Sequence, residues 1–293
     1  MNWKRFYLVL VALAINCAVF AQANLLNVKK AEDIGKKTQQ QIDSDGDDKP
    51  LPYGYISDRD VLWSKVVWEY VDLNQKINLP YYYPIDTTNA VNTRRSLYDT
   101  LLKGITTGQI TEVYQDSYFT TRIGAEEVKL ATFNERDVDG GEEQGGYTDV
   151  YTIQSQDIKG YLIKGIWYFD KRQGELKYRM LGIAPMGPDV QVLGVQEIDD
   201  KDSVYELFWI FFPDARNTLH ASKVFNPKNS AHPISYDNLL NARRFNATVI
   251  KEENLYGDRK IADYIRGNSL FQLLEADRIK EGIRDREMDM WNY

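Results

Sequence analysis

The chain has 293 residues and a formal net charge of −7, and it contains one cysteine, 20 tyrosines and 6 tryptophans. The acidic balance argues against nucleic acid as a partner and against charge-driven binding to anionic membranes. The length suits one large domain or two small ones. The many amphipathic rings indicate extensive contact surface, although an aromatic core explains any single ring at least as well.

The N-terminus has the parts of a cleavable export signal. Two basic residues precede an apolar run over residues 6–20, and small residues follow it. The run is shorter than the ~20 residues that a membrane-spanning helix needs, which favours a signal peptide over an uncleaved anchor. We expect cleavage after Ala21, with Ala23 as the alternative. Residues 1–21 are then the signal peptide, and the mature chain is periplasmic.

The only cysteine, Cys17, lies inside this predicted signal. A lipidated signal has a small residue directly before its cysteine, whereas this chain has Asn16. We therefore expect no lipid anchor and a mature chain without thiols. Because exported proteins often use disulfides, such a chain must be stabilised by its core or by partners.

Residues 22–52 are predicted to be a flexible leader, because they hold few large apolar groups that could offset the entropy of ordering. Asp43, Asp45 and Asp47 alternate within this segment as in a calcium loop. The EF-hand pattern requires a glycine at its sixth position, whereas Gly46 stands at the fourth. We interpret the run as a solvated acidic linker, with metal binding as the alternative.

The first predicted helix begins at Ser57, where Ser57 and Asp60 resemble a capping box. Large apolar residues crowd the following segment on several sides: Trp63, Val66, Val67, Tyr70, Val71 and Leu73. A helix that is apolar nearly all round is buried or forms an interface, and the core interpretation is the default.

Three consecutive tyrosines, Tyr81, Tyr82 and Tyr83, stand between Pro80 and Pro84. The prolines predict a stiff, extended backbone, on which successive side chains point to opposite sides. The three rings then cannot all pack into one core face, and we expect Tyr82 to face outward. The tyrosines are therefore candidate partner contacts. The alternative is that two are core residues and the third is an ordinary exposed tyrosine.

A second helix is predicted from Asn92 or Thr93 to Thr106, and Gly108 ends it. Its apolar residues recur at helical spacing: Leu97, Leu101, Leu102 and Ile105. Residues 110–114 then predict a short strand.

The middle of the chain has the alternation of an antiparallel sheet. Residues 160–170 alternate around large apolar side chains, residues 170–174 form a turn with a late glycine, and residues 176–184 return. This pattern predicts a β-hairpin that ends at Pro185 and Pro188.

Two further strands are predicted after the hairpin, at residues 190–195 and 205–212. The second is apolar on both faces, as in a central strand, and Pro213 closes it. The last third of the chain returns to helix, first from Ser235 to about Phe245.

A long C-terminal helix is predicted from Ser269, which forms a second capping box with Gln272. Apolar residues recur along it at helical spacing: Leu273, Ala276, Ile279, Ile283 and Met290. Opposite charges stand three apart: Glu275/Arg278, Asp277/Lys280 and Glu281/Arg284. The order of elements predicts an α+β fold, with an antiparallel β-sheet flanked by N-terminal and C-terminal helices in a single domain over residues 53–293.

The sequence holds no catalytic constellation. The predicted mature chain lacks thiols, G-x-S-x-G turns and zinc-binding spacings. Its two histidines, His220 and His232, are predicted to lie in loops. Residues 137–146 hold four glycines but no following lysine, which favours a mobile surface loop over a phosphate cradle. We expect no enzymatic activity, no cofactor and no bound metal.

Four blocks of the chain, together with its N-terminal part at residues 53–68, follow the order of a known family: 165–170 (GIWYFD), 178–185 (YRMLGIAP), 208–216 (FWIFFPDAR) and the predicted helix 269–291. They resemble the GldN/PorN proteins of gliding motility and type IX secretion in Bacteroidetes. The resemblance covers most of the predicted mature chain, although its motifs are hydrophobic and carry no chemistry.

The resemblance implies a periplasmic, non-enzymatic subunit of a secretion and gliding machine. It implies a large hetero-oligomeric ring with a GldK/PorK-like outer-membrane lipoprotein, which would hold the protein at the inner face of the outer membrane. It also implies contact with a GldM/PorM-like periplasmic motor component. The family supplies no catalytic residues to transfer.

Two other functions stay open at this point. The first is a periplasmic carbohydrate-acting enzyme with paired carboxylates, which a pocket with two close acids and aromatic platforms would favour. The second is a periplasmic ligand-binding or chaperone-like module, which a single large apolar cleft would favour.

Overall fold

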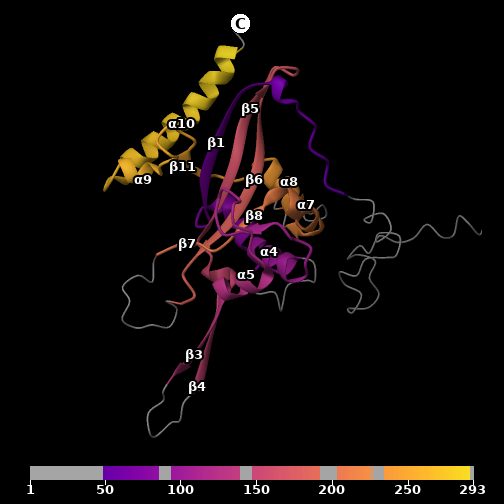
Figure 1. Cartoon of the computed structure of the whole chain (residues 1–293), viewed down its shortest axis with the longest axis vertical. Helices are drawn as coiled ribbons and strands as arrows, with labels where there is room; N and C mark the ends of the chain where they lie inside the picture. Colours follow the sequence, from indigo (N-terminus) through magenta and orange to yellow (C-terminus); the bar gives the residue numbers. More distant parts are fainter. Residues whose placement is uncertain are drawn as a thin grey trace, which may run out of the picture. The chain divides into compact units, whose positions relative to one another are not determined.

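The computed structural model describes residues 49–85, 94–138, 147–191, 203–224, 226 and 234–290 (Figure 1). Residues Pro50–Ala90 and Arg94–Tyr293 form one compact unit. The predicted signal peptide, the calcium-like run and nearly all of the predicted leader lie outside the described residues. Within the described residues, no helix combines the length and the apolar character that crossing a bilayer requires.

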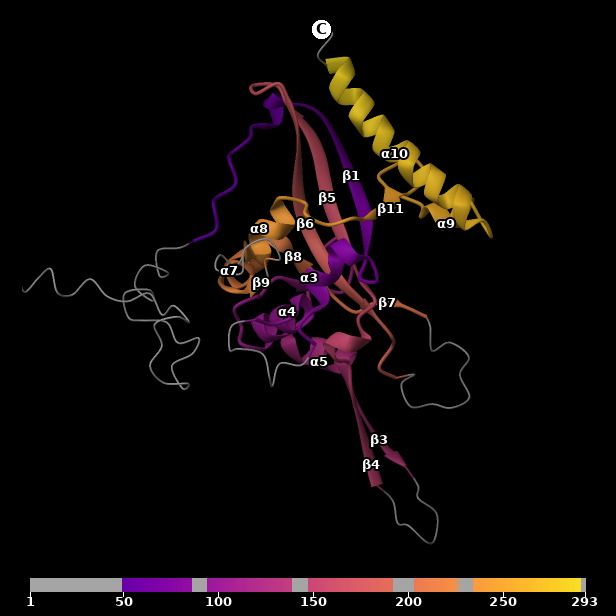
Figure 2. The ribbon, with the colours of Figure 1, turned by 180° about the vertical axis from the view of Figure 1, so that it is seen from behind.

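A seven-stranded sheet forms the frame of this unit (Figures 1 and 2). Its order is β11-β1-β5-β6-β8-β2, and β7 pairs with β6 beside this path. The strands are β1 (Val61–Asp72), β2 (Val113–Tyr114), β5 (Gly160–Asp170), β6 (Glu175–Gly187), β7 (Tyr205–Glu206), β8 (Trp209–Phe211) and β11 (Thr248–Glu252). All of these pairs are antiparallel, so the predicted α+β fold with an antiparallel sheet is confirmed.

The predicted hairpin is present as β5 and β6, joined by a turn in which Gly174 has a φ of 65°. The strand does not end at Pro185, however, but continues to Gly187. Proline lacks only the amide N–H, and the carbonyl of Pro185 still accepts a hydrogen bond from the amide of Leu207. The hairpin therefore continues past the proline.

The predicted helix from Ser57 is wrong. Only a short 3-10 turn, η3 (Asp58–Asp60), is present before the long strand β1. Its β-branched and aromatic residues favour a strand, and a strand buried on both faces is apolar on both sides. Val67 packs against the C-terminal helix on one face, whereas Trp68 packs against Leu162, Ala184 and Trp209 on the other.

Helices cover one face of the sheet and enclose the main core. They are α3 (Leu79–Tyr82), α4 (Leu97–Thr106), α5 (Ala125–Thr132), α7 (Phe212–Ala221) and α8 (Tyr236–Asn241), with 3-10 turns η4 (Lys76–Asn78) and η5 (Ser155–Asp157). Ser96 caps α4 by accepting a hydrogen bond from the amide of Asp99, so the predicted cap at Asn92 or Thr93 is corrected to Ser96. Ser235 caps α8 as predicted.

The predicted strand 205–212 is divided. Residues 205–206 form β7 and residues 209–211 form β8, and α7 begins at Phe212 with Pro213 in its first turn. A proline there fits helix geometry, because the first amides of a helix have no intrahelical acceptor. Val190, at the start of the predicted strand 190–195, lies in a turn, and residues 192–195 are outside the described ones.

Two small hairpins complete the unit: β3 (Phe133–Val138) with β4 (Tyr147–Thr152), and β9 (Lys223–Val224) with β10 (Ile234–Ser235). The predicted loop 137–146 therefore starts later than expected, because residues 137–138 belong to β3. Its remaining residues, 139–146, lie outside the described ones.

The C-terminal part consists of α9 (Ile261–Tyr264) and α10 (Ser269–Met290). The side chain of Asn268, not that of Ser269, caps α10 by accepting from the amide of Phe271. In Figures 1 and 2, α10 lies beside β11 and β1, whereas α7 and α8 lie beside β6 and β8. The predicted long terminal helix is confirmed.

Candidate interaction cleft

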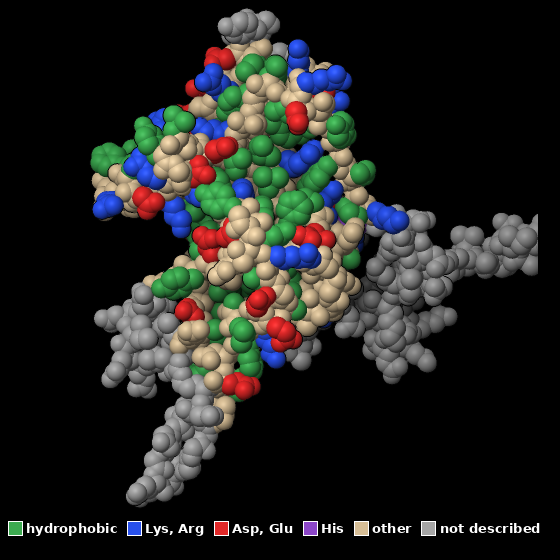
Figure 3. All heavy atoms as spheres, in the orientation of Figure 1, with side chains coloured by type: hydrophobic (Ala, Val, Ile, Leu, Met, Phe, Trp, Pro, Cys, Tyr) green, Lys and Arg blue, Asp and Glu red, His purple; other side chains and the backbone are tan. Residues whose placement is uncertain are grey.

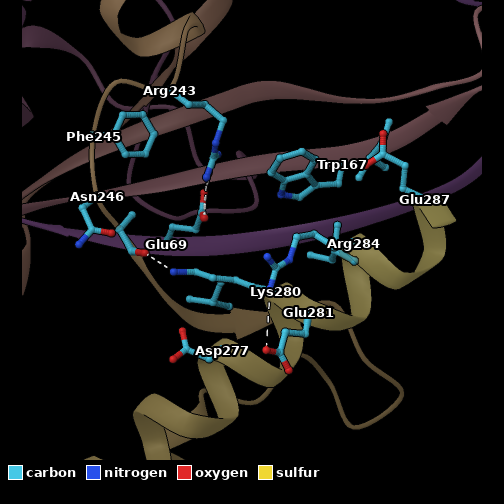
Figure 4. A pocket seen from close by; sticks show the side chains of 14 residues that line it. Glu69, Trp167, Arg243, Phe245, Asn246, Asp277, Lys280, Glu281, Arg284 and Glu287 are labelled. Carbon is cyan, nitrogen blue, oxygen red and sulfur yellow. Dashed lines mark hydrogen bonds and ion pairs between the residues drawn. The ribbon is translucent and has the colours of Figure 1, made fainter.

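A cleft of about 660 Å³ opens between α10 and the sheet (Figure 4). We call it the α10 cleft. It is lined by Glu69, Trp167, Leu176, Arg243, Phe245, Asn246, Ala247, Val249, Asp277, Lys280, Glu281, Ile283, Arg284 and Glu287. The sheet and the segment before β11 supply most of its apolar side chains, and α10 supplies most of its charged groups. The cleft is therefore amphipathic rather than a single large apolar pocket.

The ion pair between Glu69 and Arg243 forms the inner wall of the α10 cleft. Glu69 comes from β1 and is 2% exposed, and the guanidinium of Arg243 donates to both carboxylate oxygens at 2.8 and 2.9 Å. The backbone of Arg243 has a φ of 50°, a conformation that directs the chain back toward the sheet directly after α8. A buried carboxylate requires such a partner, because an unpaired charge is expensive to desolvate.

Aromatic rings surround this ion pair. The guanidinium carbon of Arg243 lies 4.0 Å from the ring centroid of Tyr178, 5.0 Å from that of Trp167 and 5.2 Å from that of Phe245. Burial lowers the pKa of Arg243, but the hydrogen bonds and charge of Glu69 outweigh it and raise that pKa. Burial, followed by the charge of Glu69, raises the pKa of the Tyr178 phenol well above its usual range. Both groups keep one protonation state near neutral pH.

Helix α10 forms the outer wall. Its inward stripe, Ala276, Ile279 and Ile283, packs against Val67, Val249 and Ile261. The ammonium of Lys280 donates to the backbone carbonyl of Ala247, which connects the helix to the segment before β11. Lys280 makes this contact instead of the predicted pair with Asp277, whereas the predicted pairs Glu275/Arg278 and Glu281/Arg284 are present.

The chemistry of the α10 cleft suits binding better than acid–base catalysis. Its one buried carboxylate is held at both oxygens by Arg243, so it is neither a free proton donor nor a free nucleophile. The described residues include no group of three His, Cys, Asp or Glu side chains placed to hold a metal ion. His220 lies in α7 and is 9% exposed, so its predicted loop position is wrong; His232 is outside the described residues.

The predicted contact tyrosines lie elsewhere, on a backbone that is helical rather than extended. Tyr81 and Tyr82 belong to α3, because Pro80 fits the first turn of a helix. Tyr81 is 1% exposed and packs edge-on against Phe245, directly behind the cleft. Tyr82 is half-buried, and its hydroxyl donates to the carbonyl of Gln156. Tyr83, at 53% exposed, is the ring that faces outward, in place of Tyr82.

Sequence reasoning did not find the Glu69–Arg243 pair, whose members are 174 positions apart. The one local signal is an acidic residue inside the apolar run of β1, since a carboxylate in such a run needs a buried partner. Nothing in the sequence around Arg243 identifies it as that partner.

Comparison with known families now identifies the chain. The profile of the family described as "Gliding motility associated protein GldN" matches residues 56–292, which is most of the chain. The chain belongs to the GldN family. The match runs from just before β1 to beyond α10, so both walls of the α10 cleft are part of the GldN region. A search of curated proteins finds no match.

Proposed function

We propose that this chain is a non-enzymatic interaction subunit of a periplasmic machine for gliding motility and type IX secretion. The observation that carries the proposal is the GldN match, which spans residues 56–292 and describes a gliding motility protein. The α10 cleft supports a binding role, because its buried carboxylate is held at both oxygens by Arg243 and so is not free for acid–base chemistry.

The proposed partners are a GldK/PorK-like outer-membrane lipoprotein and a GldM/PorM-like periplasmic motor component. The chain would join a large hetero-oligomeric ring at the inner face of the outer membrane, and its membrane association would pass through these partners. The proposal includes export, with residues 1–21 removed. Mass spectrometry of the mature N-terminus checks that part, and an intact Met1 or a lipidated Cys17 would contradict it.

Affinity purification from native membranes tests the assembly. The mature chain carries a C-terminal tag, membranes are extracted with a mild detergent, and the co-purifying proteins are identified by mass spectrometry. We expect a lipoprotein and a motor component in stable ratio to the tagged chain. Purification of the chain alone, or with a carbohydrate substrate that it turns over, would overturn the proposal.

The tyrosines at the C-terminal end of α3, Tyr82 inside the helix and Tyr83 directly after it, allow a sharper test of a contact residue. Tyr83 is exposed, whereas the hydroxyl of its neighbour Tyr82 is bonded to backbone. Because tyrosine is frequent at interface hot spots, truncating one in a true contact costs about 2 kcal/mol or more of binding. Replacing Tyr83 by alanine should then reduce co-purification at least tenfold without changing Tm. Tyr82→Ala is the matched control, since its main effect should be a lower Tm. If the two variants recover the partners equally well, Tyr83 is not a partner contact.

A further inference from the structure

Exposed apolar side chains gather where α9 meets the start of α10. We call this the α10 N-terminal patch, and its members are Tyr256, Tyr264, Leu270, Phe271, Leu273 and Leu274. Leu270 is 63% exposed and Phe271 is 56% exposed. Figure 3 shows hydrophobic side chains next to Lys and Arg side chains at this end of α10, on its left. Contiguous exposed apolar surface of this kind marks an interaction site.

At the start of α10 the patch forms a ridge with a groove on each side. The ridge consists of Leu270, Phe271, Leu273 and Leu274. One groove, of about 600 Å³, lies between β11, α9 and α10 and is lined in part by Ile261, Leu270 and Leu273. The other, of about 640 Å³, is lined in part by Ile265, Phe271 and Leu274. A ridge between two grooves can receive apolar side chains on both of its sides, as helices do when they pack ridges into grooves.

The packing of α10 on its own unit does not require this patch. The helix docks through Ala276, Ile279 and Ile283, one narrow stripe on the opposite side. Further along, most outward positions are charged, as at Glu281 and Arg284, and Met288 is a single exposed apolar side chain there. Exposed apolar character on α10 is therefore concentrated in its first two turns, where the two grooves also lie.

The charges beside the patch determine which partner fits it. Lys260 and Arg278 are paired with Glu206 and Glu275. Arg259 instead stacks on aromatic rings, with its guanidinium carbon 4.6 Å from the centroid of Tyr256 and 5.5 Å from that of Tyr264. Among the residues that the structure describes, it has no carboxylate partner. A stacked guanidinium keeps its edge donors available for a carboxylate.

A second arginine at the edge of the patch, Arg266, also lacks a carboxylate partner among the described residues. The Nε of Arg266 donates to the backbone carbonyl of Asp263, and no described carboxylate pairs with it. The patch thus combines apolar grooves with two cations that lack ion-pair partners in the described part of the chain. That combination is complementary to apolar side chains flanked by carboxylates.

We propose that the α10 N-terminal patch docks an acidic amphipathic segment of a different protein. Its leucine-like or phenylalanine-like side chains occupy the two grooves, and its Asp or Glu side chains bind Arg259 and Arg266. The inference rests on the proposed interaction role and states where one partner binds and with what chemistry. An anionic membrane fits less well, because each of the two grooves can receive a separate side chain, which a bilayer surface does not offer.

Site-specific photo-crosslinking in cells tests the docking site. A benzophenone amino acid replaces Phe271 in the full chain, and the matched control places it at Met288, which is 65% exposed on the same helix beyond the patch. We expect a heterologous adduct from position 271 and at least tenfold less of it from position 288. Mass spectrometry of the cross-linked peptide should locate apolar residues next to Asp or Glu.

The charge requirement is tested in the same cells. Arg259→Glu should lower the yield of the adduct at least tenfold while Tm stays unchanged, because the side chain is exposed. Arg286→Glu is the control, an exposed arginine on α10 outside the patch, and should leave the yield as it was. If the probe at position 271 lowers Tm, the same measurement is made with the probe at Leu274, on the same ridge.

Several outcomes would overturn this inference: an adduct with a second copy of the chain only, an adduct with lipid only, equal adducts at positions 271 and 288, or a partner segment without acids. They are distinguishable from failure of the proposed function. If the tagged chain still brings down its partners while position 271 gives no heterologous adduct, the docking site is wrong and the interaction role stands. If nothing co-purifies, the proposed function itself fails.

Discussion

Helices α7 and α10 are attached to the same sheet in opposite ways. In the 10-residue helix α7, six residues are buried, including Phe212, Ala215 and Leu219, at 0% exposed. In the 22-residue helix α10, three are buried, Ala276, Ile279 and Ile283. A helix embedded on most sides is part of the core, whereas a helix held by one stripe keeps its other sides available for partners.

This difference predicts a difference in dynamics. Opening α7 exposes the main core and therefore requires global unfolding. Opening α10 exposes a small second cluster around Val67 and Val249, so it should cost less free energy and occur more often. The α10 cleft borders the more weakly attached helix, α10, with the Glu69–Arg243 pair on its inner wall.

The largest expected effect comes from removing one partner of that pair. Arg243→Met leaves the carboxylate of Glu69 buried without a counter-charge, and the loss of one partner of a buried ion pair costs about 3–5 kcal/mol. Denaturant unfolding should show this loss in the midpoint.

The neighbouring Arg244→Met is the control, because Arg244 is exposed and does not line the cleft. The double variant Glu69→Leu/Arg243→Met should regain part of the stability, since it leaves no unpaired buried charge. A loss for Arg243→Met no larger than that for Arg244→Met would show that the pair does not hold the cleft together.

A pair of truncations compares the two helices directly. Leu219→Ala in α7 removes a fully buried side chain from the main core and should lower the free energy of global unfolding by about 2–5 kcal/mol. Ile279→Ala in α10 removes a side chain of similar size, but mainly from the interface that closes α10. It should speed amide hydrogen exchange in residues 276–290 while the amides of β5 keep their protection. Equal loss of protection in both regions would show that α10 is part of one cooperative core.

The next largest effect comes from replacing glycines by alanine, which should lower stability at Gly165 and raise it at Gly282. A Cβ on Gly165 would clash with the hydroxyl end of Tyr178, whose ring contacts Trp167 and Arg243. Gly165→Ala should therefore displace Tyr178 and lower the free energy of unfolding by about 1–3 kcal/mol. Denaturant unfolding measures this loss, and Tm should fall with it. Gly282→Ala in α10 is the matched control. Nothing lies within 4 Å of its Cβ, and alanine should stabilise the helix by up to about 1 kcal/mol.

The success of sequence reasoning depended on how local each signal was. The β5–β6 hairpin and α10 follow from alternation, turn residues and helical spacing within one short segment, and both were predicted. In contrast, β1 pairs with β5 and β11, so its burial on both faces depends on residues far away in the sequence. From the segment alone, a two-faced apolar run is compatible with a buried helix or a central strand, and the cap-like Ser57 favoured the wrong one.

The same limit applies to the candidate sites. Glu69 and Arg243 meet only because β1 lies between β5 and β11 and because the chain reverses after α8. The tyrosines of α3 were misplaced because prolines are compatible both with an extended segment and with the first turn of a helix. Because the backbone is helical up to Tyr82, the ring that faces outward is Tyr83, directly after α3, instead of Tyr82.

The smallest effect concerns the connection between α9 and α10, where Glu275 accepts hydrogen bonds from Arg278 and from the hydroxyl of Tyr264. Arg278, first, and then Tyr264 hold the pKa of Glu275 below its ordinary 4.5, against the opposing effect of burial. A carboxyl with a depressed pKa stabilises the fold above its unfolded pKa, and this stabilisation is lost as pH falls through the folded value. Arg278 is largely exposed, so the contribution at pH 7 is only about 0.5–1 kcal/mol.

Glu275→Gln should lower stability by that amount at pH 7, and its difference from the unmodified chain should shrink between pH 5 and pH 3. Asp277→Asn, at an exposed acid two positions further along α10, is the control for replacing a carboxylate on this helix. A difference that stays constant down to pH 3 would mean that Glu275 contributes through packing rather than through its charge.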